Sequence, residues 1–128
     1  MTQPQPAPPS ESTYAGLRVA PFDEAERARE LVGMTAEQMA AFLGISNRTY
    51  ERRAKSGTLR EAESVKVAFL TESLRLAEEV LHGAEHASAW MRSPLLAFGR
   101  RTPIEMLHSV RGYEQVKDAL NRIRYGMY

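Results

Sequence analysis

Two helix-start signals on either side of a glycine most constrain how this chain can fold. Thr35 and Gln38 form a T-x-x-Q capping box, in which each side chain satisfies a backbone N–H group that the first helical turn leaves free. Gly44 can adopt the left-handed conformation that ends this short helix, and Ser46 is a good N-cap for the next one. The segment from Thr35 to Lys55 is therefore predicted to be a helix-turn-helix.

The second helix of this motif is predicted to bury one face and expose a basic one. Tyr50 and Ala54, spaced i, i+4, are expected to point inward. The residues expected to point outward are Asn47, Arg48, Glu51, Arg52 and Lys55. Arginine can bind guanine or phosphate and asparagine can pair with adenine, so this face is typical of a helix that binds in the major groove of DNA. The alternative is an αα-hairpin with a solvated basic face.

The positive charge of the chain lies in two separate blocks. The formal net charge is only +1 over 128 residues. Residues 48–60 carry 5 basic and 1 acidic side chains, and residues 100–128 carry 6 and 3, whereas residues 1–47 and 61–99 each carry 3 basic and 6 acidic side chains. Two blocks indicate two interaction surfaces rather than one diffuse basic surface.

Helical signals flank the motif on both sides. Residues 1–20 are rich in proline and poor in large apolar side chains, so we expect a flexible tail. Asp23 is expected to cap a first helix that ends at Gly33. Residues 60–82 hold the longest helical pattern, with two neighbouring apolar stripes, one of which begins at Ala62. Such a helix is expected to be buried over a wide face, at the centre of the core or in a dimer interface.

The last part of the chain is also predicted to be helical. Residues 95–98 form an apolar run, and Thr102 and Glu105 form a second capping box with proline at the first helical position. A final helix is expected after Gly112 from the i, i+3, i+4, i+7 spacing of its apolar residues. No alternating strand pattern appears, and the predicted class is all-α. The expected segments are a tail over 1–20, a helix-turn-helix and dimerisation region over 21–82, and a C-terminal domain over 83–128.

Several kinds of site are disfavoured by composition. The chain has no cysteine, which excludes disulfides, thiolate zinc sites and cysteine nucleophiles. His82 and His86 have a metal-capable i, i+4 spacing, but a surface helix end explains them as well. No nucleophile elbow or phosphate-binding glycine loop is present, so we expect no enzyme, cofactor or metal. Neither a signal-peptide pattern nor a membrane-length apolar run occurs, and the expected location is the cytoplasm.

The C-terminal basic block ends in cationic, aromatic and methionine side chains. The residues concerned are Arg122, Arg124, Tyr125, Met127 and Tyr128. A frayed helix end is the default interpretation of such a segment. Arginine, tyrosine and methionine are nevertheless enriched where protein surfaces anchor partners, so we expect a partner-binding surface here.

Both halves of the chain resemble one known family. Residues 34–59 are similar to the N-terminal helix-turn-helix of Xre/MbcA/ParS-type antitoxins, and the C-terminal half resembles their C-terminal domain. The C-terminal residues that carry this resemblance are Trp90, Ser93, Pro94, 101–107, Gly112, Val116, Leu120, Ile123 and Gly126. The combination of the two halves in this order makes the resemblance specific.

The resemblance implies a dimeric antitoxin that covers the active site of a co-encoded RES-type toxin, an NAD-consuming enzyme, and represses its own operon by binding promoter DNA. With the motif, it indicates DNA contacts from Thr35, Gln38, Ser46, Asn47, Arg48, Arg52, Arg53 and Lys55. Together with the composition of this segment, it indicates toxin contacts from Arg122, Arg124, Tyr125, Met127 and Tyr128. The alternatives are a stand-alone repressor whose C-terminal domain only dimerises, and a protein-interaction module with no DNA role.

Overall fold

The computed structural model describes residues 19–126, and all its regular structure is helical. Its elements are α2 (Phe22–Val32), α3 (Ala36–Leu43), α4 (Asn47–Ser56), α5 (Glu61–Leu81), α6 (Ala84–Met91), the 3-10 helix η1 (Leu96–Phe98), α7 (Pro103–Met106) and α8 (Val110–Arg124). Extended pairing within this range is limited to two isolated bridges, Pro21 with Thr58 and Leu95 with Arg101. The all-α prediction is therefore confirmed. No helix in residues 19–126 combines the length and apolar character needed to cross a membrane.

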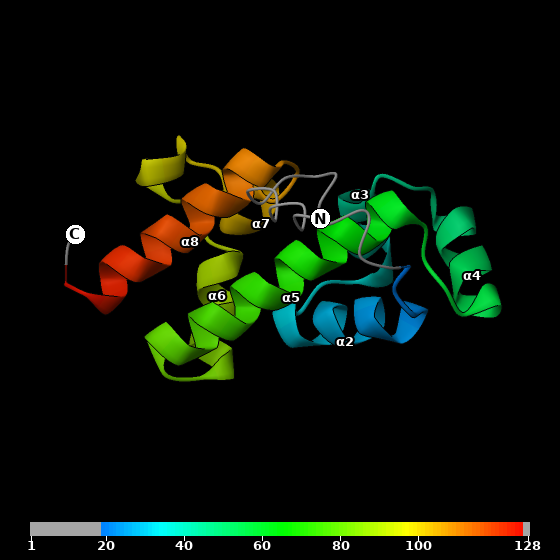
Figure 1. Ribbon diagram of the computed structural model, residues 1–128, viewed down its shortest axis with the longest axis horizontal. Helices are drawn as coiled ribbons and strands as arrows, with labels where there is room; N and C mark the ends of the chain where they lie inside the picture. The colour runs from blue at the N-terminus through cyan, green and yellow to red at the C-terminus, as the bar shows by residue number, and fades with distance from the viewer. Residues whose placement is uncertain (1–18, 127–128) are drawn as a thin grey trace, which may run out of the picture.

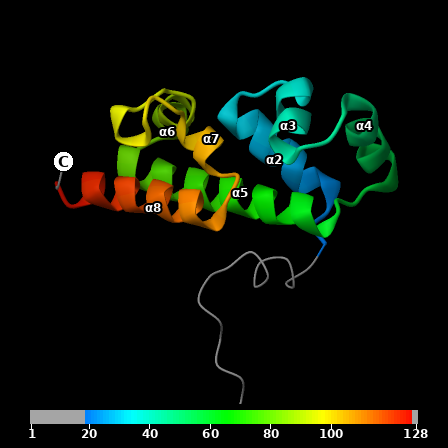
Figure 2. The same cartoon turned by 90° about the horizontal axis from the view of Figure 1, so that it is seen from above.

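Helix α5 is the centre of the structure and is shared by both halves of the chain. It runs along the long axis with α8 beside it, and the remaining helices lie on the other side of this pair (Figures 1 and 2). Phe69, Leu70 and Ala77 of α5 are almost completely buried in one continuous core. The predicted wide buried face is thus correct, although Ala62, which was expected to begin one of the stripes, is exposed.

Helix α8 runs parallel to α5 and contacts it from its middle to its C-terminal end. Near the start of α8, the ring of Tyr113 stacks on that of Phe69 with centroids 4.4 Å apart. Near its end, the Arg124 guanidinium donates to the Glu79 carboxylate at 2.7 Å. The two contacts occur in the same order along both helices, so the helices run in the same direction. Together they fix the orientation of the C-terminal half on the shared core.

The helix ends follow the capping signals closely. Thr35 and Gln38 form both hydrogen bonds of the capping box at the start of α3, and Thr102 and Glu105 do the same for α7. Gly44 ends α3 in the left-handed conformation, with φ of 77°. These contacts are local, which is why the sequence alone was sufficient to predict them.

The start of the core differs from the sequence expectation. Helix α2 begins at Phe22 with Pro21 as N-cap and no side-chain cap, so Asp23 lies in the first turn, where its charge favours the helix dipole. Ala20 is buried, and its backbone N–H donates to the Ser64 hydroxyl at 2.8 Å. The segment expected as a tail therefore contributes to the core at this residue, while its residues 1–18 lie outside the described range.

Gly112 lies inside α8 rather than ahead of it. The helix begins at Val110 because Ser109 is its N-cap and accepts a hydrogen bond from the Gly112 N–H at 3.0 Å. A Cβ atom at residue 112 would lie 1.7 Å from the Met106 carbonyl oxygen. The backbones of α7 and α8 therefore meet at a point where only glycine fits.

Candidate functional site

The turn between α3 and α4 is built from backbone and capping contacts. The Ile45 N–H donates to the Ala40 carbonyl at 3.0 Å, next to the left-handed Gly44. Ser46 then caps α4 by accepting from the Thr49 N–H at 3.1 Å. Ala40 is only 1% exposed, as expected for a small residue at a close helix crossing. These contacts fix the angle at which α4 leaves the core.

Tyr50 anchors α4 from its inner face. Its ring packs edge-to-face on Phe22 with centroids 5.0 Å apart, and its hydroxyl donates to the Glu26 carboxylate at 2.5 Å. Glu26 also accepts two hydrogen bonds from Arg29, which in turn donates to the Met34 carbonyl at 3.0 Å. Arg29 and Tyr50 together hold the pKa of Glu26 below its usual range, while burial and Glu26 raise that of Tyr50. Tyr50 is thus inward, as predicted, and linked to α2.

Arg53 is the second inward residue of α4, in place of the expected Ala54. Its guanidinium makes two hydrogen bonds to the Glu63 carboxylate, at 2.8 and 3.0 Å, whereas Ala54 is exposed. Glu63 also accepts from the Arg60 N–H at 3.0 Å. Burial acts to raise the pKa of Glu63, but the hydrogen bonds from Arg53 and from the Arg60 backbone outweigh it and the pKa is lowered. Arg53 therefore joins α4 to α5 instead of extending to solvent.

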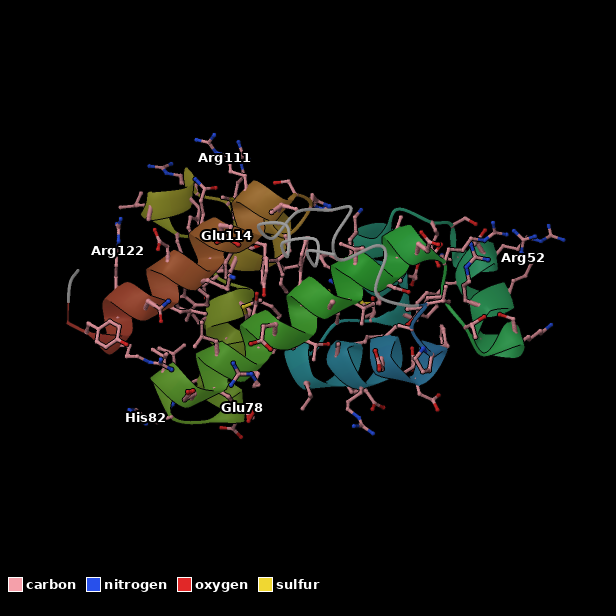
Figure 3. The ribbon with its side chains drawn as sticks, in the orientation of Figure 1. Arg52, Glu78, His82, Arg111, Glu114 and Arg122 are labelled. Atoms are coloured by element: carbon pink, nitrogen blue, oxygen red, sulfur yellow. The ribbon has the colours of Figure 1, made fainter. Side chains whose placement is uncertain are left out.

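The outer face of α4 carries the basic side chains expected there. Asn47, Arg48, Glu51, Arg52 and Lys55 are all exposed. Arg52 projects away from the body at one end of the molecule (Figure 3) and donates to the Thr49 hydroxyl at 3.1 Å. The other sequence-predicted residues of this site, Thr35, Gln38 and Ser46, lie at the N-terminal ends of α3 and α4, where their side chains form the caps.

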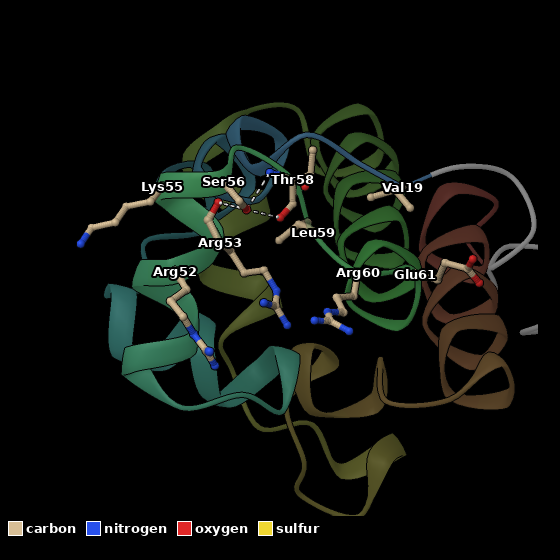
Figure 4. Close-up of a pocket in the computed structure, with 9 residues that line it drawn as sticks. All are labelled: Val19, Arg52, Arg53, Lys55, Ser56, Thr58, Leu59, Arg60 and Glu61. Atoms are coloured by element: carbon tan, nitrogen blue, oxygen red, sulfur yellow. Dashed lines mark hydrogen bonds between the residues drawn. The ribbon is translucent and has the colours of Figure 1, made fainter.

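An open hollow of about 980 Å³ adjoins the C-terminal end of α4. Figure 4 shows its lining, with Arg60 of the following loop opposite α4. Arg60 is exposed, and it adds a cation to those of Arg52 and Lys55 on the same lining. Sequence patterning counted Arg60 within the basic block but assigned it no role in the site.

The predicted partner-binding residues lie at the far end of the molecule from Arg52. Arg122 is exposed there (Figure 3), and the Tyr125 side chain is 66% exposed. Arg124 is bound to Glu79 of α5 through the contact described above. The other two, Met127 and Tyr128, lie outside the described residues.

A groove of about 470 Å³ runs between η1 and α8 in this half. Its lining is mainly apolar: Trp90, Leu95, Leu96, Ala97, Phe98, Ala119 and Ile123, with Gln115, Asp118 and Arg122. The apolar run 95–98 is split by the fold, because Phe98 is buried whereas Leu96 is 82% exposed. The run was visible in the sequence, but the exposure of one member depends on the loop that holds it.

The loop of residues 95–101, which holds Leu96, is a hydrogen-bonded hairpin. The Leu95 N–H donates to the Arg101 carbonyl at 3.1 Å, and the Arg100 N–H donates to the Leu95 carbonyl at 2.9 Å. Gly99 and Arg100 both have positive φ, of 64° and 69°. A left-handed backbone is uncommon for arginine and is retained where surrounding contacts impose it. Leu96 is therefore held in its exposed position by a defined backbone.

The two histidines considered for metal binding have structural roles at a helix end. His82 follows α5 in the left-handed conformation, with φ of 60°, and the His86 Nδ1 atom lies 3.2 Å from the Leu81 carbonyl oxygen. Across residues 19–126, no three histidine or acidic side chains are grouped so that they could hold a metal ion.

Comparisons with known proteins match both halves of the chain. The model of the antitoxin Xre-like helix-turn-helix domain matches residues 19–70, and that of the antitoxin Xre/MbcA/ParS C-terminal toxin-binding domain matches residues 76–126. Antitoxin Xre of Photorhabdus laumondii is 30% identical over 86 residues, which is 66% of this chain and 58% of the relative's length. The fold resembles a chain in the crystal structure of the M. tuberculosis MbcT-MbcA toxin-antitoxin complex, with a TM-score of 0.64, 20% identity, and coverage of 84% of this chain and 96% of the other. The protein described here belongs to the Xre/MbcA/ParS family of antitoxins, with an Xre-like helix-turn-helix domain preceding the toxin-binding domain.

Proposed function

We propose that this antitoxin acts in the cytoplasm through two surfaces, one that represses its own operon and one that neutralises a RES-type, NAD-consuming toxin. The observation that carries this proposal is the separation of two exposed cationic surfaces, with Arg52 at one end of the molecule and Arg122 at the other (Figure 3). Two ends of one body can bind DNA and a protein at the same time. The role is regulatory, and the chain performs no chemistry of its own.

In the DNA-binding proposal, the outer face of α4 enters the major groove. Asn47, Arg48 and Arg52 supply base-edge or phosphate contacts, because their side chains are exposed on one helix face. Arg60 and Lys55 flank this face and are suited to phosphates. Thr35, Gln38 and Ser46 contribute from the capped ends of α3 and α4, where N–H groups favour phosphate. Arg53, held by Glu63, positions α4 and is not itself available to DNA.

A gel-shift titration of the purified protein on its own upstream promoter tests this proposal. Arg52→Ala is expected to weaken binding by about 1–3 kcal/mol if the side chain contacts a base. Arg27→Ala, an exposed arginine on α2, is the matched control and is expected to leave affinity unchanged. Absence of binding by the unmodified protein at low salt, where phosphate contacts are strongest, would refute the DNA-binding proposal.

In the toxin proposal, the C-terminal domain covers the active site of the toxin with the end of α8. Exposed Arg122 and Tyr125 are available for this contact, and Arg124 contributes while bound to Glu79. Met127 and Tyr128 are proposed on composition and on the family resemblance. Co-expression with the neighbouring gene tests the proposal, because growth arrest by the neighbour should be relieved by this chain. A harmless neighbour, or one that stays toxic beside this chain, would refute it.

We further propose that the protein acts as a homodimer. Dimeric helix-turn-helix proteins bind two half-sites spaced by one helical turn of DNA, so a two-fold repeat in the protected promoter is expected. Light scattering on the purified protein measures the state directly. A monomer at the concentrations that bind DNA would contradict this part of the proposal.

A further inference from the structure

We propose that the groove between η1 and α8 receives one segment of the toxin, whose apolar side chains cover Leu96 and whose carboxylates bind Arg111 and Arg122. This inference rests on the proposed toxin-neutralising function and identifies the surface that performs it. All residues of the groove lie within the part of the chain, 76–126, that matches the toxin-binding domain model.

Leu96 provides the apolar part of the argument. A leucine that is 82% exposed leaves most of its surface in water, and the groove beside it is lined by the side chains of Trp90, Phe98 and Ile123. Covering this surface releases water and is favourable without any change in the antitoxin. Because the hairpin already fixes the backbone of Leu96, binding does not have to order a flexible loop.

Helix α8 provides the polar part. Arg111, Gln115, Asp118 and Arg122 are spaced i, i+4, i+7 and i+11, so they form one stripe along the helix. The last three line the groove, and Figure 3 shows Arg111 and Arg122 projecting to the same side. From the helical rise, the two arginines are about 16 Å apart along the axis.

The stripe indicates the chemistry of the occupant. Two arginines at the ends favour carboxylates about 16 Å apart, since arginine binds carboxylate groups with paired hydrogen bonds. Asp118 between them disfavours an acidic residue at the middle of the same segment. The occupant is therefore an apolar segment with acidic residues towards both ends. A second copy of this chain is the competing occupant, and the experiment below separates the two.

Binding of the full-length antitoxin to the protein encoded by the neighbouring gene, in a catalytically inactive form, tests the inference by calorimetry. Leu96→Asp is expected to weaken binding by about 10- to 100-fold, the effect of exposing one large aliphatic contact and adding a charge. Arg111→Glu and Arg122→Glu are each expected to weaken it at least 10-fold. The matched controls are Leu31→Asp, at a leucine 48% exposed on α2, and Arg27→Glu, and both are expected to bind as the unmodified protein does.

Each outcome has a defined meaning. Because Leu96 and the arginines are exposed, thermal unfolding and promoter binding of these variants should remain unchanged, which excludes misfolding as the cause of lost affinity. Unchanged toxin affinity in Leu96→Asp overturns the inference and leaves the antitoxin proposal intact. A changed oligomeric state in that variant overturns it in favour of a second copy. No binding by the unmodified protein refutes the antitoxin proposal itself.

Discussion

Replacing Gly112 with alanine is expected to destabilise the fold, although alanine is the better helix former. The added Cβ would lie 1.7 Å from the Met106 carbonyl oxygen, and real Cβ atoms essentially never come closer than 3.0 Å to such a neighbour. The obstacle is backbone, which cannot rotate away as a flexible side chain can. Helices α7 and α8 must therefore move apart at their crossing.

The two opposing effects can be compared in magnitude. Alanine in place of glycine within a helix favours folding by roughly 0.5–1 kcal/mol. Overpacking of a tight contact costs typically about 1–3 kcal/mol, and more where a rigid group is displaced. Because the displaced group is backbone, the upper end of this cost applies to Gly112→Ala, and we expect a net loss of about 2 kcal/mol. This is a sizeable part of the roughly 5–15 kcal/mol that holds a domain folded.

Urea denaturation followed by circular dichroism measures this loss. The unfolding midpoint of Gly112→Ala should fall while the slope of free energy against urea stays the same. Gln115→Ala, at an exposed position of the same helix, is the control and should lie within about 0.5 kcal/mol of the unmodified protein. If Gly112→Ala is as stable as the unmodified protein or more so, the close approach of α7 and α8 does not limit packing and the reasoning is refuted.

Three further predictions concern α4 and its anchors. Glu63→Gln should lower the free energy of unfolding by about 2–3 kcal/mol, because Arg53 keeps its half-buried charge without a counterion. Folding lowers the pKa of Glu63, so its contribution to the free energy of unfolding is complete above about pH 5 and is lost as the pH falls through the pKa of the folded state. Urea titrations at pH 3–7 should therefore show a smaller decrease in the free energy of unfolding at acid pH for Glu63→Gln than for the unmodified protein. Tyr50→Phe should cost about 1.5 kcal/mol, because Glu26 loses a charge-assisted hydrogen bond, and an unchanged unfolding midpoint would contradict this. Arg60→Gln should reduce the slope of log affinity for promoter DNA against log salt by about 1 without affecting sequence preference, whereas a base contact would alter preference in a gel-shift competition.

Local contacts were predictable from the sequence, and contacts between helices were not. The capping boxes at Thr35 and Thr102 depend on residues three positions apart, so their pattern is visible in the chain itself. The register of α4 was predicted incorrectly at its second turn. Arg53 is drawn inward by Glu63, ten residues away on another helix, and helical periodicity alone favours the smaller and less polar Ala54.

The candidate sites show the same difference between features set by local sequence and features set by contacts between distant residues. Basic patterning located the outer face of α4, because exposed charges on one helix follow directly from helical spacing. The exposure of Leu96 could not be predicted, since a leucine in an apolar run is expected to be buried. Gly112 was predicted as a helix boundary because glycine commonly marks helix ends, whereas its role is to let two backbones meet.

The unbroken course of α5 through both halves limits how the two surfaces can influence each other. A helix of 21 residues is about 31 Å long and has no proline or glycine at which it could bend. Under the proposed function, toxin binding at one end is therefore not expected to act on the proposed DNA-binding face of α4 by bending of α5. Under the proposed function, the toxin would instead alter promoter affinity by linking several antitoxin chains into one assembly. A second contact with DNA would then form at a raised effective concentration. Repression would then depend on the ratio of toxin to antitoxin, with the rigid helix setting the spacing between occupied sites.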